Sequence, residues 1–150
     1  MVHSIGALLV SSLLALAPFL TRDIGKAFAA NDARALSGLL SASAGLHVSL
    51  PDPISFSDRV SRQQSYFLLA RIFNVHRTFE FVPEPDLSFV PGKPGFIFKA
   101  RWSFRDTRNG NPYLFRIFFY VRPRPDAPAG SLTPSSGPPW EIVEIKAERL

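Results

Sequence analysis

Residues 96–122 constrain the fold of this 150-residue chain more than any other stretch. Two apolar-rich runs flank Asn109-Gly110, a dipeptide that tolerates the two positive φ angles of a type I′ hairpin turn. The stretch therefore predicts one long antiparallel hairpin in which Arg108 lies opposite Asn111. Alternate residues of its two strands are all apolar and share one face. They are Phe98, Ala100, Trp102, Phe104, Phe115, Ile117, Phe119 and Val121.

The opposite face of the same hairpin mixes cations with aromatic rings. In the predicted register Lys99 lies opposite Tyr120 and Arg101 lies opposite Phe118, so cation–π pairs are expected across the strands. Such a face suits a homodimer or other protein interface, a solvated surface, or the binding of an anion or single-stranded nucleic acid. We call it the basic-aromatic face, and its members are Lys99, Arg101, Arg105, Arg116, Phe118, Tyr120 and Arg122.

The composition narrows the class of protein. A chain of this length suits a single domain with a real core. The absence of cysteine excludes disulfides, thiolate catalysis and cysteine-ligated zinc. The net charge of +5 weakly favours anionic partners, although no long basic run is present. The three histidines are scattered, so neither a metal site nor a cofactor is expected.

Helices are predicted before the hairpin. Residues 24–40 carry two apolar stripes at helical spacing, interrupted at residues 31–32, which predicts two short helices that meet at a corner. Ser61 and Gln64 have the spacing of a capping box and open a longer helix through residues 64–73. This helix is apolar nearly all round. We therefore expect it to be pressed between the sheet and neighbouring helices, covering the apolar face of the hairpin.

Three further strands are predicted from alternating apolar and polar residues. They cover residues 46–50, 78–82 and 140–150, and the last is expected to pair with the hairpin. Residues 123–139 are rich in Pro, Gly and Ser and predict a flexible surface loop. Helices on one face of a mostly antiparallel sheet define an α+β fold.

Residues 1–20 differ in composition from the rest of the chain. Residues 5–20 are apolar apart from one glycine and two serines, which is typical of a signal peptide and short for a membrane span. We therefore expect a periplasmic or secreted protein, with no stable membrane span in the mature chain. An N-terminal apolar helix is the alternative, because no Lys or Arg precedes Arg22 and Pro18 follows the small-residue site at 15–17.

Five segments carry a resemblance to a known superfamily: residues 24–40, 48–51, 64–73, 115–120 and 140–148. With their order along residues 21–150, they resemble the NTF2-like (cystatin-like) superfamily. More narrowly, the chain looks like the DUF4783 family of small exported bacterial proteins of unknown function. The resemblance implies a cone, in which a curved, mostly antiparallel sheet carries helices on one face. It leaves the activity open, because these segments contain no catalytic signature.

The resemblance also implies a pocket, because cones of this kind can enclose one between the long helix and the sheet. The residues expected to line it are Tyr66, Ala70, Phe73, Phe98, Trp102, Phe104, Ile117 and Phe119. Acid-base catalysis there would need an inward carboxylate or histidine, and the predicted inward face of the hairpin has none. We therefore expect no catalytic residue.

Simpler roles are expected for the titratable residues elsewhere. His47 should lie on the outer side of its strand, and His76 should cap the last carbonyl groups of the long helix. Asp106, near the predicted turn, should be solvated. The glutamates of the last strand are expected to neutralise nearby arginines: Glu141, Glu144 and Glu148.

The sequence thus favours an exported NTF2-like binding or interaction module of unknown ligand, without enzymatic activity. Its expected partner is a second copy or another protein, with a small apolar ligand as an alternative. An isomerase or hydrolase acting on a small apolar substrate in the cone is the competing hypothesis. An anion or nucleic-acid binder that uses the basic-aromatic face is the third, although export would separate the chain from intracellular nucleic acid.

Overall fold

The computed structural model describes residues 20–42, 44–124 and 140–150. The expectations for residues 1–20 and 123–139 therefore fall almost wholly outside the described residues. A helix over residues 20–29 is followed by the remaining elements in chain order. These are α2 (Ala33–Ser37), β1 (Leu46–Leu50), β2 (Phe56–Val60), α3 (Arg62–Val75), β3 (His76–Pro83), β4 (Ser88–Phe89), β5 (Phe96–Asp106), β6 (Pro112–Pro123) and β7 (Trp140–Arg149). No helix within the described ranges is long and apolar enough to cross a membrane.

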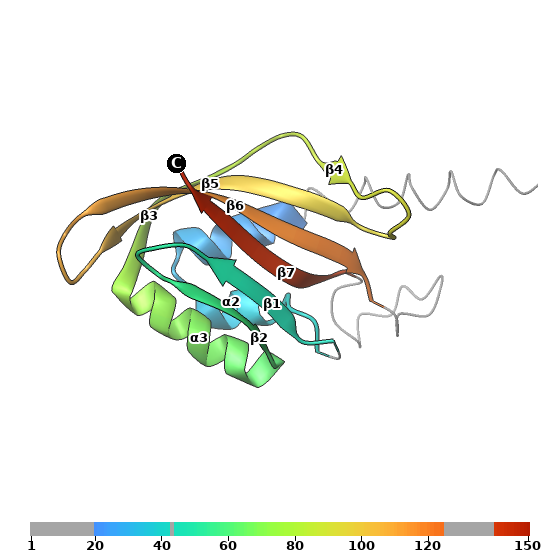
Figure 1. The fold of residues 1–150 in the computed structure, drawn as a ribbon, viewed down its shortest axis with the longest axis horizontal. Helices are drawn as coiled ribbons and strands as arrows, with labels where there is room; N and C mark the ends of the chain where they lie inside the picture. The colour runs from blue at the N-terminus through green and yellow to red at the C-terminus, as the bar shows by residue number, and fades with distance from the viewer. Residues whose placement is uncertain (1–19, 43, 125–139) are drawn as a thin grey trace, which may run out of the picture.

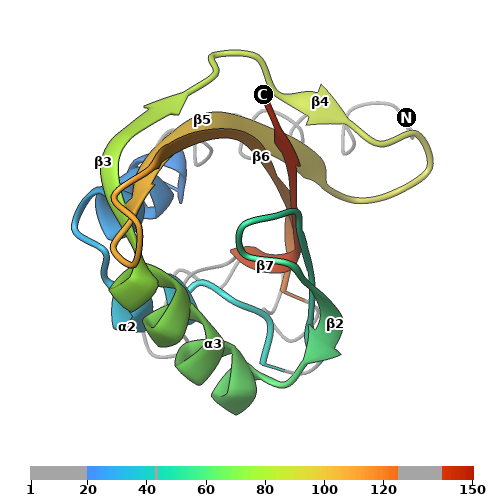
Figure 2. The ribbon, with the colours of Figure 1, turned by 60° about the vertical axis from the view of Figure 1, so that its left-hand side comes forward.

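The strands form one curved, mostly antiparallel sheet in the order β2-β1-β7-β6-β5-β3, and β4 also pairs with β5. The pairing of β1 with β7 is parallel. Figure 1 shows the helices gathered on one side of this sheet. Figure 2 shows the sheet curving from β3 over β5 and β6 to β7, with α3 on the concave side. The predicted α+β cone, with helices on one face of a curved sheet, is confirmed.

Local sequence signals explain the helices. Asp32 caps α2, its side chain accepting a hydrogen bond from the backbone N–H of Ala35 at 3.0 Å. The predicted capping box of α3 is present. The Ser61 hydroxyl accepts from the Gln64 backbone N–H at 3.1 Å, and the Gln64 side chain accepts from the Ser61 N–H at 2.9 Å. Both helices therefore begin where their capping residues predict.

The expectation that α3 is pressed on both sides is wrong. Its buried residues are Ser65, Leu69, Ile72 and Phe73, which lie along one side. Phe67 points outward and is 64% exposed. The physical reason is that α3 is the outermost layer on the concave side of the sheet. Only the side of α3 that faces the sheet contacts the core (Figure 2).

The hairpin has the predicted faces and a different register. Phe104 pairs with Tyr113 and Trp102 with Phe115, which is a shift of two residues from the prediction. A two-residue shift preserves the faces, because side chains alternate with a period of two. All eight residues of the predicted apolar face are 1% exposed or less, so that prediction is confirmed.

The predicted type I′ turn is wrong. The strands are joined by a five-residue loop, residues 107–111, in which only Gly110 has a positive φ, at 76°. Its amide donates to the Asp106 carbonyl at 2.7 Å. The Asp106 carboxylate accepts from the Arg108 backbone N–H at 2.8 Å and holds the longer loop. This side-chain bond to the backbone sets the register in place of Asn109-Gly110.

Candidate functional site

The space between α3 and the sheet is filled by side chains. The void that remains there has a volume of about 10 Å³, which is roughly the minimum for one water molecule. Its walls contain no titratable group, since they consist of Phe28, Val48, Leu50, Leu69, Ile72, Phe73, Trp102, Ile117 and Ile145. Phe28 is the main filler, since its ring centre lies 5.2 Å from those of both Phe73 and Trp102.

The residues expected to line a pocket are distributed over three places. Phe73, Trp102 and Ile117 border the small void. Three others are buried in the surrounding core: Phe98, Phe104 and Phe119. Tyr66 and Ala70 instead border a surface groove of about 410 Å³ beside α2, and Phe73 also reaches this groove. The structure therefore does not bring the eight residues around one pocket.

A buried ionic cluster joins the end of α3 to the tip of the hairpin. His76 is 5% exposed, and its Nδ1 lies 3.2 Å from the carbonyl oxygen of Ile72, which confirms the expected capping of the helix. Asp106 is 1% exposed, so the expectation that it is solvated is wrong. Along β5 every second residue points into the core, and Asp106 follows Trp102 and Phe104 in this alternation. The alternation is the sequence signal that could have predicted the burial of Asp106.

Arg108 neutralises Asp106. The Arg108 Nε and Nη2 atoms donate to the two carboxylate oxygens at 3.1 and 2.9 Å. These hydrogen bonds lower the pKa of Asp106 to about 2. Burial lowers the pKa of His76, and this effect outweighs the attraction of Asp106.

The geometry of His76 suits a structural role better than proton transfer. Its Nδ1 faces a carbonyl oxygen and therefore carries the proton in the neutral ring. Its Nε2 lies 3.8 Å from Oδ2 of Asp106 and has no hydrogen-bond partner among the described residues. The backbone N–H of Thr107 also donates to the carbonyl of Val75 at 2.8 Å. The cluster thus holds the hairpin loop against the end of α3.

The basic-aromatic face lies on the convex side of the sheet, with cross-strand pairs that differ from the prediction. Lys99 pairs with Phe118, and Arg101 pairs with Arg116. On the other flank Phe118 pairs with Lys146 of β7, so this ring lies between two lysines. The expected pairs of Lys99 with Tyr120 and of Arg101 with Phe118 are wrong, because the longer loop shifts the register.

Carboxylates neutralise part of this face. Arg122 pairs with Glu141 at 3.0 Å, while Arg116 contacts Glu84 at 3.1 Å and Glu148 at 3.5 Å. The expected role of Glu141 and Glu148 is therefore confirmed, whereas Glu144 pairs with a lysine, Lys146, at 3.5 Å. The Arg105 guanidinium donates to the carbonyl of Gly110 at 2.6 Å. Within the described part of the chain, Lys99 and Arg101 have no carboxylate partner.

A groove of about 370 Å³ crosses the basic-aromatic face. Its apolar floor includes Phe118 and Tyr120, and the Lys93 ammonium lies 5.9 Å from the centre of the Tyr120 ring. The full lining is Val90, Lys93, Ile97, Phe118, Tyr120, Glu144 and Lys146. Rings surrounded by charges of both signs suit the binding of another macromolecular surface.

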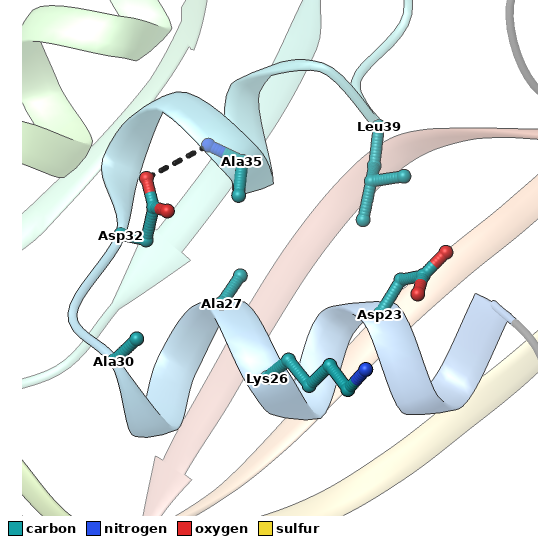
Figure 3. Close-up of a pocket in the computed structure, with 7 residues that line it drawn as sticks. All are labelled: Asp23, Lys26, Ala27, Ala30, Asp32, Ala35 and Leu39. Atoms are coloured by element: carbon teal, nitrogen blue, oxygen red, sulfur yellow. Dashed lines mark hydrogen bonds between the residues drawn. The ribbon is translucent and has the colours of Figure 1, made fainter.

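A third groove, of about 340 Å³, lies between the helix over residues 20–29 and α2 (Figure 3). Its wall is largely alanine, and Asp23 and Lys26 lie along its rim. Asp32 is already used as the cap of α2. No group of three or more potential metal ligands occurs in residues 20–42, 44–124 and 140–150.

The comparisons with known proteins define the class of fold. No family model and no curated protein matches this sequence. An NTF2-like protein from Cytophaga hutchinsonii is similar, with a TM-score of 0.60 and 11% identity over 91% of this chain and 97% of its own. A ketosteroid isomerase-like protein from Erwinia carotovora atroseptica has a TM-score of 0.64 and 12% identity over 91% of this chain and 95% of its own. The protein therefore has the NTF2-like fold.

Within this fold the chain resembles DUF4783 structures. One such protein, from Bacteroides uniformis, has a TM-score of 0.62 and 11% identity, covering 86% of this chain and 95% of its own. The resemblance stated from the sequence is thus supported by structure. At these identities the likeness concerns the fold.

Proposed function

We propose that this protein is a non-enzymatic interaction module that pairs with a second copy of itself through the basic-aromatic face. The observation that carries the proposal is the filled interior, where a void of about 10 Å³ is bordered by apolar side chains alone. Acid-base catalysis needs a titratable group within reach of a bound substrate. The space beneath α3 offers neither the room nor the group.

The arrangement of charges supports a second copy as the partner. Along β7 the outward residues alternate in sign, because Lys146 lies between Glu144 and Glu148. Lys99 and Arg101 lie two strands away on the same face. A two-fold axis near Phe118 can therefore place the cations of one copy opposite the carboxylates of the other, around an aromatic centre.

Binding of nucleic acid has less support. Two of the arginines that would contact phosphates, Arg116 and Arg122, are already paired with carboxylates of the same chain. Each such pair reduces the number of counterions that a nucleic acid would release on binding. Three cations of the face have no carboxylate partner among the described residues, namely Lys99, Arg101 and Arg105, and three are too few for strong electrostatic binding.

Sedimentation of the purified protein tests the proposal. The wild type should sediment as a dimer, and Phe118→Asp should sediment as a monomer, because it places a carboxylate at the centre of the interface. Phe67→Asp is the matched control, since Phe67 is an exposed phenylalanine on the opposite side of the molecule. A wild type that remains monomeric at about 100 µM, a concentration at which even micromolar affinities give mostly dimer, would refute pairing through this face.

We also propose that the protein is exported, on the basis of residues 1–20, of which residues 1–19 lie outside the described residues. Fusion of residues 1–30 to a phosphatase that is active only after export provides the test. Activity of the fusion in a bacterial host supports export. Phosphatase that accumulates inactive inside the cell contradicts it.

A further inference from the structure

A separate pocket of about 310 Å³ lies beside the second half of α3, against the loop that joins β1 to β2. Its volume falls at the lower end of the range for small-ligand sites. One part of its lining is apolar and consists of Pro53, Ile54, Phe56, Leu68, Ile72 and Val75. These residues provide a compact apolar surface that is distinct from the filled interior.

All the charged side chains that line this pocket are basic. They are Arg71 of α3 and Arg108 of the hairpin loop. The guanidinium of Arg71 has no hydrogen bond or ion pair to any other described residue. Arg108 uses Nε and Nη2 to bind Asp106, which leaves its Nη1 atom free to donate. The ion pair of Arg108 with Asp106 carries no net charge, so Arg71 supplies the net positive charge of the pocket.

His76 also lines the pocket, and it is almost completely buried. Its Nε2 lacks a hydrogen-bond partner among the described residues, which is unusual for a buried polar atom. The neutral ring contributes no negative charge, and the protonated ring contributes a positive one. Nε2 can donate a hydrogen bond to a bound anion only in the protonated ring, because the neutral ring carries its proton on Nδ1.

We infer that this pocket binds a small organic anion, with one carboxylate on a compact apolar body. The carboxylate pairs with Arg71 and the free edge of Arg108, since a guanidinium matches a carboxylate in shape and charge. The apolar body packs against Leu68 and Ile72. The inference is independent of the proposed pairing of two copies, because α3 lies on the concave side of the sheet and the basic-aromatic face on the convex side (Figure 2).

The test is titration of the full chain with three ligands of one shape, followed by amide chemical shifts in NMR spectra. Benzoate is the anion, benzyl alcohol the neutral analogue and benzylamine the cation. Benzoate should shift amides of residues 54–56, 68–76 and 107–108 with millimolar affinity, and benzyl alcohol should bind at least about tenfold more weakly, with no binding of benzylamine. Equal binding of benzoate and benzyl alcohol, or no shifts with benzoate, would overturn the inference.

Two variants and a control sharpen the result. Arg71→Gln should weaken benzoate binding at least about tenfold, because it removes an unpaired guanidinium at the pocket. Arg62→Gln, on the same helix and outside the pocket, should bind like the wild type. Leu68→Trp should fill the pocket and abolish binding while the thermal midpoint is kept. Benzoate affinity that is unchanged in both Arg71→Gln and Leu68→Trp would place binding elsewhere and refute this site.

Discussion

Nε2 of His76 lies 3.8 Å from Oδ2 of Asp106, and both side chains are buried between the end of α3 and the tip of the β5–β6 hairpin. The two residues are 30 positions apart in the sequence, and His76 is the first residue of β3, directly after α3. His76 faces the carbonyl of Ile72, and Asp106 binds Arg108. The contact between His76 and Asp106 therefore joins the end of α3 to the sheet. The charges of these two side chains affect the stability of the fold.

Acidification should destabilise the fold through His76. Burial lowers the pKa of His76 from its ordinary 6.5, and repulsion from the Arg108 cation lowers it further. The attraction of the Asp106 carboxylate raises this pKa but does not outweigh burial. At pH values between 6.5 and the lower pKa of the folded state, the unfolded state binds more protons than the folded state. The free energy of unfolding therefore falls as the pH falls. Urea melts between about pH 7 and pH 5 should show this loss, and His76→Gln should reduce it. His47→Gln is the control, and an equal slope in His76→Gln would refute the assignment.

A second loss of stability is expected at lower pH. The hydrogen bonds from Arg108 hold the pKa of Asp106 at about 2, below the ordinary 3.8. The stabilisation from this carboxylate is complete at pH values above the ordinary pKa of 3.8, and it is lost as the pH falls from 3.8 toward 2. Asp106→Asn should remove this step and lower the thermal midpoint at neutral pH, because Arg108 loses its partner. Asp23→Asn changes an exposed side chain and should leave this loss of stability at low pH unchanged. If Asp106→Asn still shows the same loss, another carboxylate is responsible for it.

Trp102 should contribute strongly to stability. Its ring is 1% exposed, and its Nε1 donates to the hydroxyl of Thr78 at 2.8 Å. Trp102→Ala should lower the free energy of unfolding by about 3 to 5 kcal/mol. Phe67→Ala, at an exposed ring, should change it by less than about 0.5 kcal/mol. Similar effects of the two variants in chemical denaturation would mean that Trp102 is not part of the core.

Gly95 should not tolerate a side chain. A Cβ atom at this position would overlap the carbonyl oxygen of Val121, so β6 would have to move. Gly95→Ala should therefore destabilise the protein by about 1 to 3 kcal/mol. Gly38→Ala is the control, because its backbone is right-handed helical and the nearest atom to its Cβ is 3.4 Å away. Equal melting temperatures for the two variants would contradict the close approach of these strands.

The faces of the hairpin were predictable and its register was not. Alternation along β5 and β6 depends only on the pleat of a strand, so it assigned Trp102 and Phe119 to the core correctly. The loop depended on a bond between the Asp106 side chain and the backbone of Arg108, which competes with the turn preference of Asn109-Gly110. Short-range propensity alone could not decide between these two turns.

The candidate sites were harder to predict for a different reason. Whether the cone is hollow depends on Phe28, which comes from a helix far from the hairpin in sequence and packs between Phe73 and Trp102. The pocket beside α3 likewise joins three separate segments of chain. The burial of Asp106 was the exception, because it follows the same alternation as Phe104.

Disulfide formation in a single-cysteine variant tests the proposed pairing most directly. The chain has no cysteine of its own, so Phe118→Cys introduces one reactive thiol at the proposed two-fold axis. Phe67→Cys places one on the opposite side as a control for random collision. A disulfide forms readily only when the two Cα atoms come within about 7 Å. Pairing through the basic-aromatic face predicts that Phe118→Cys forms a covalent dimer much faster than Phe67→Cys, as measured by mass spectrometry under non-reducing conditions. Equal rates in the two variants would contradict the pairing.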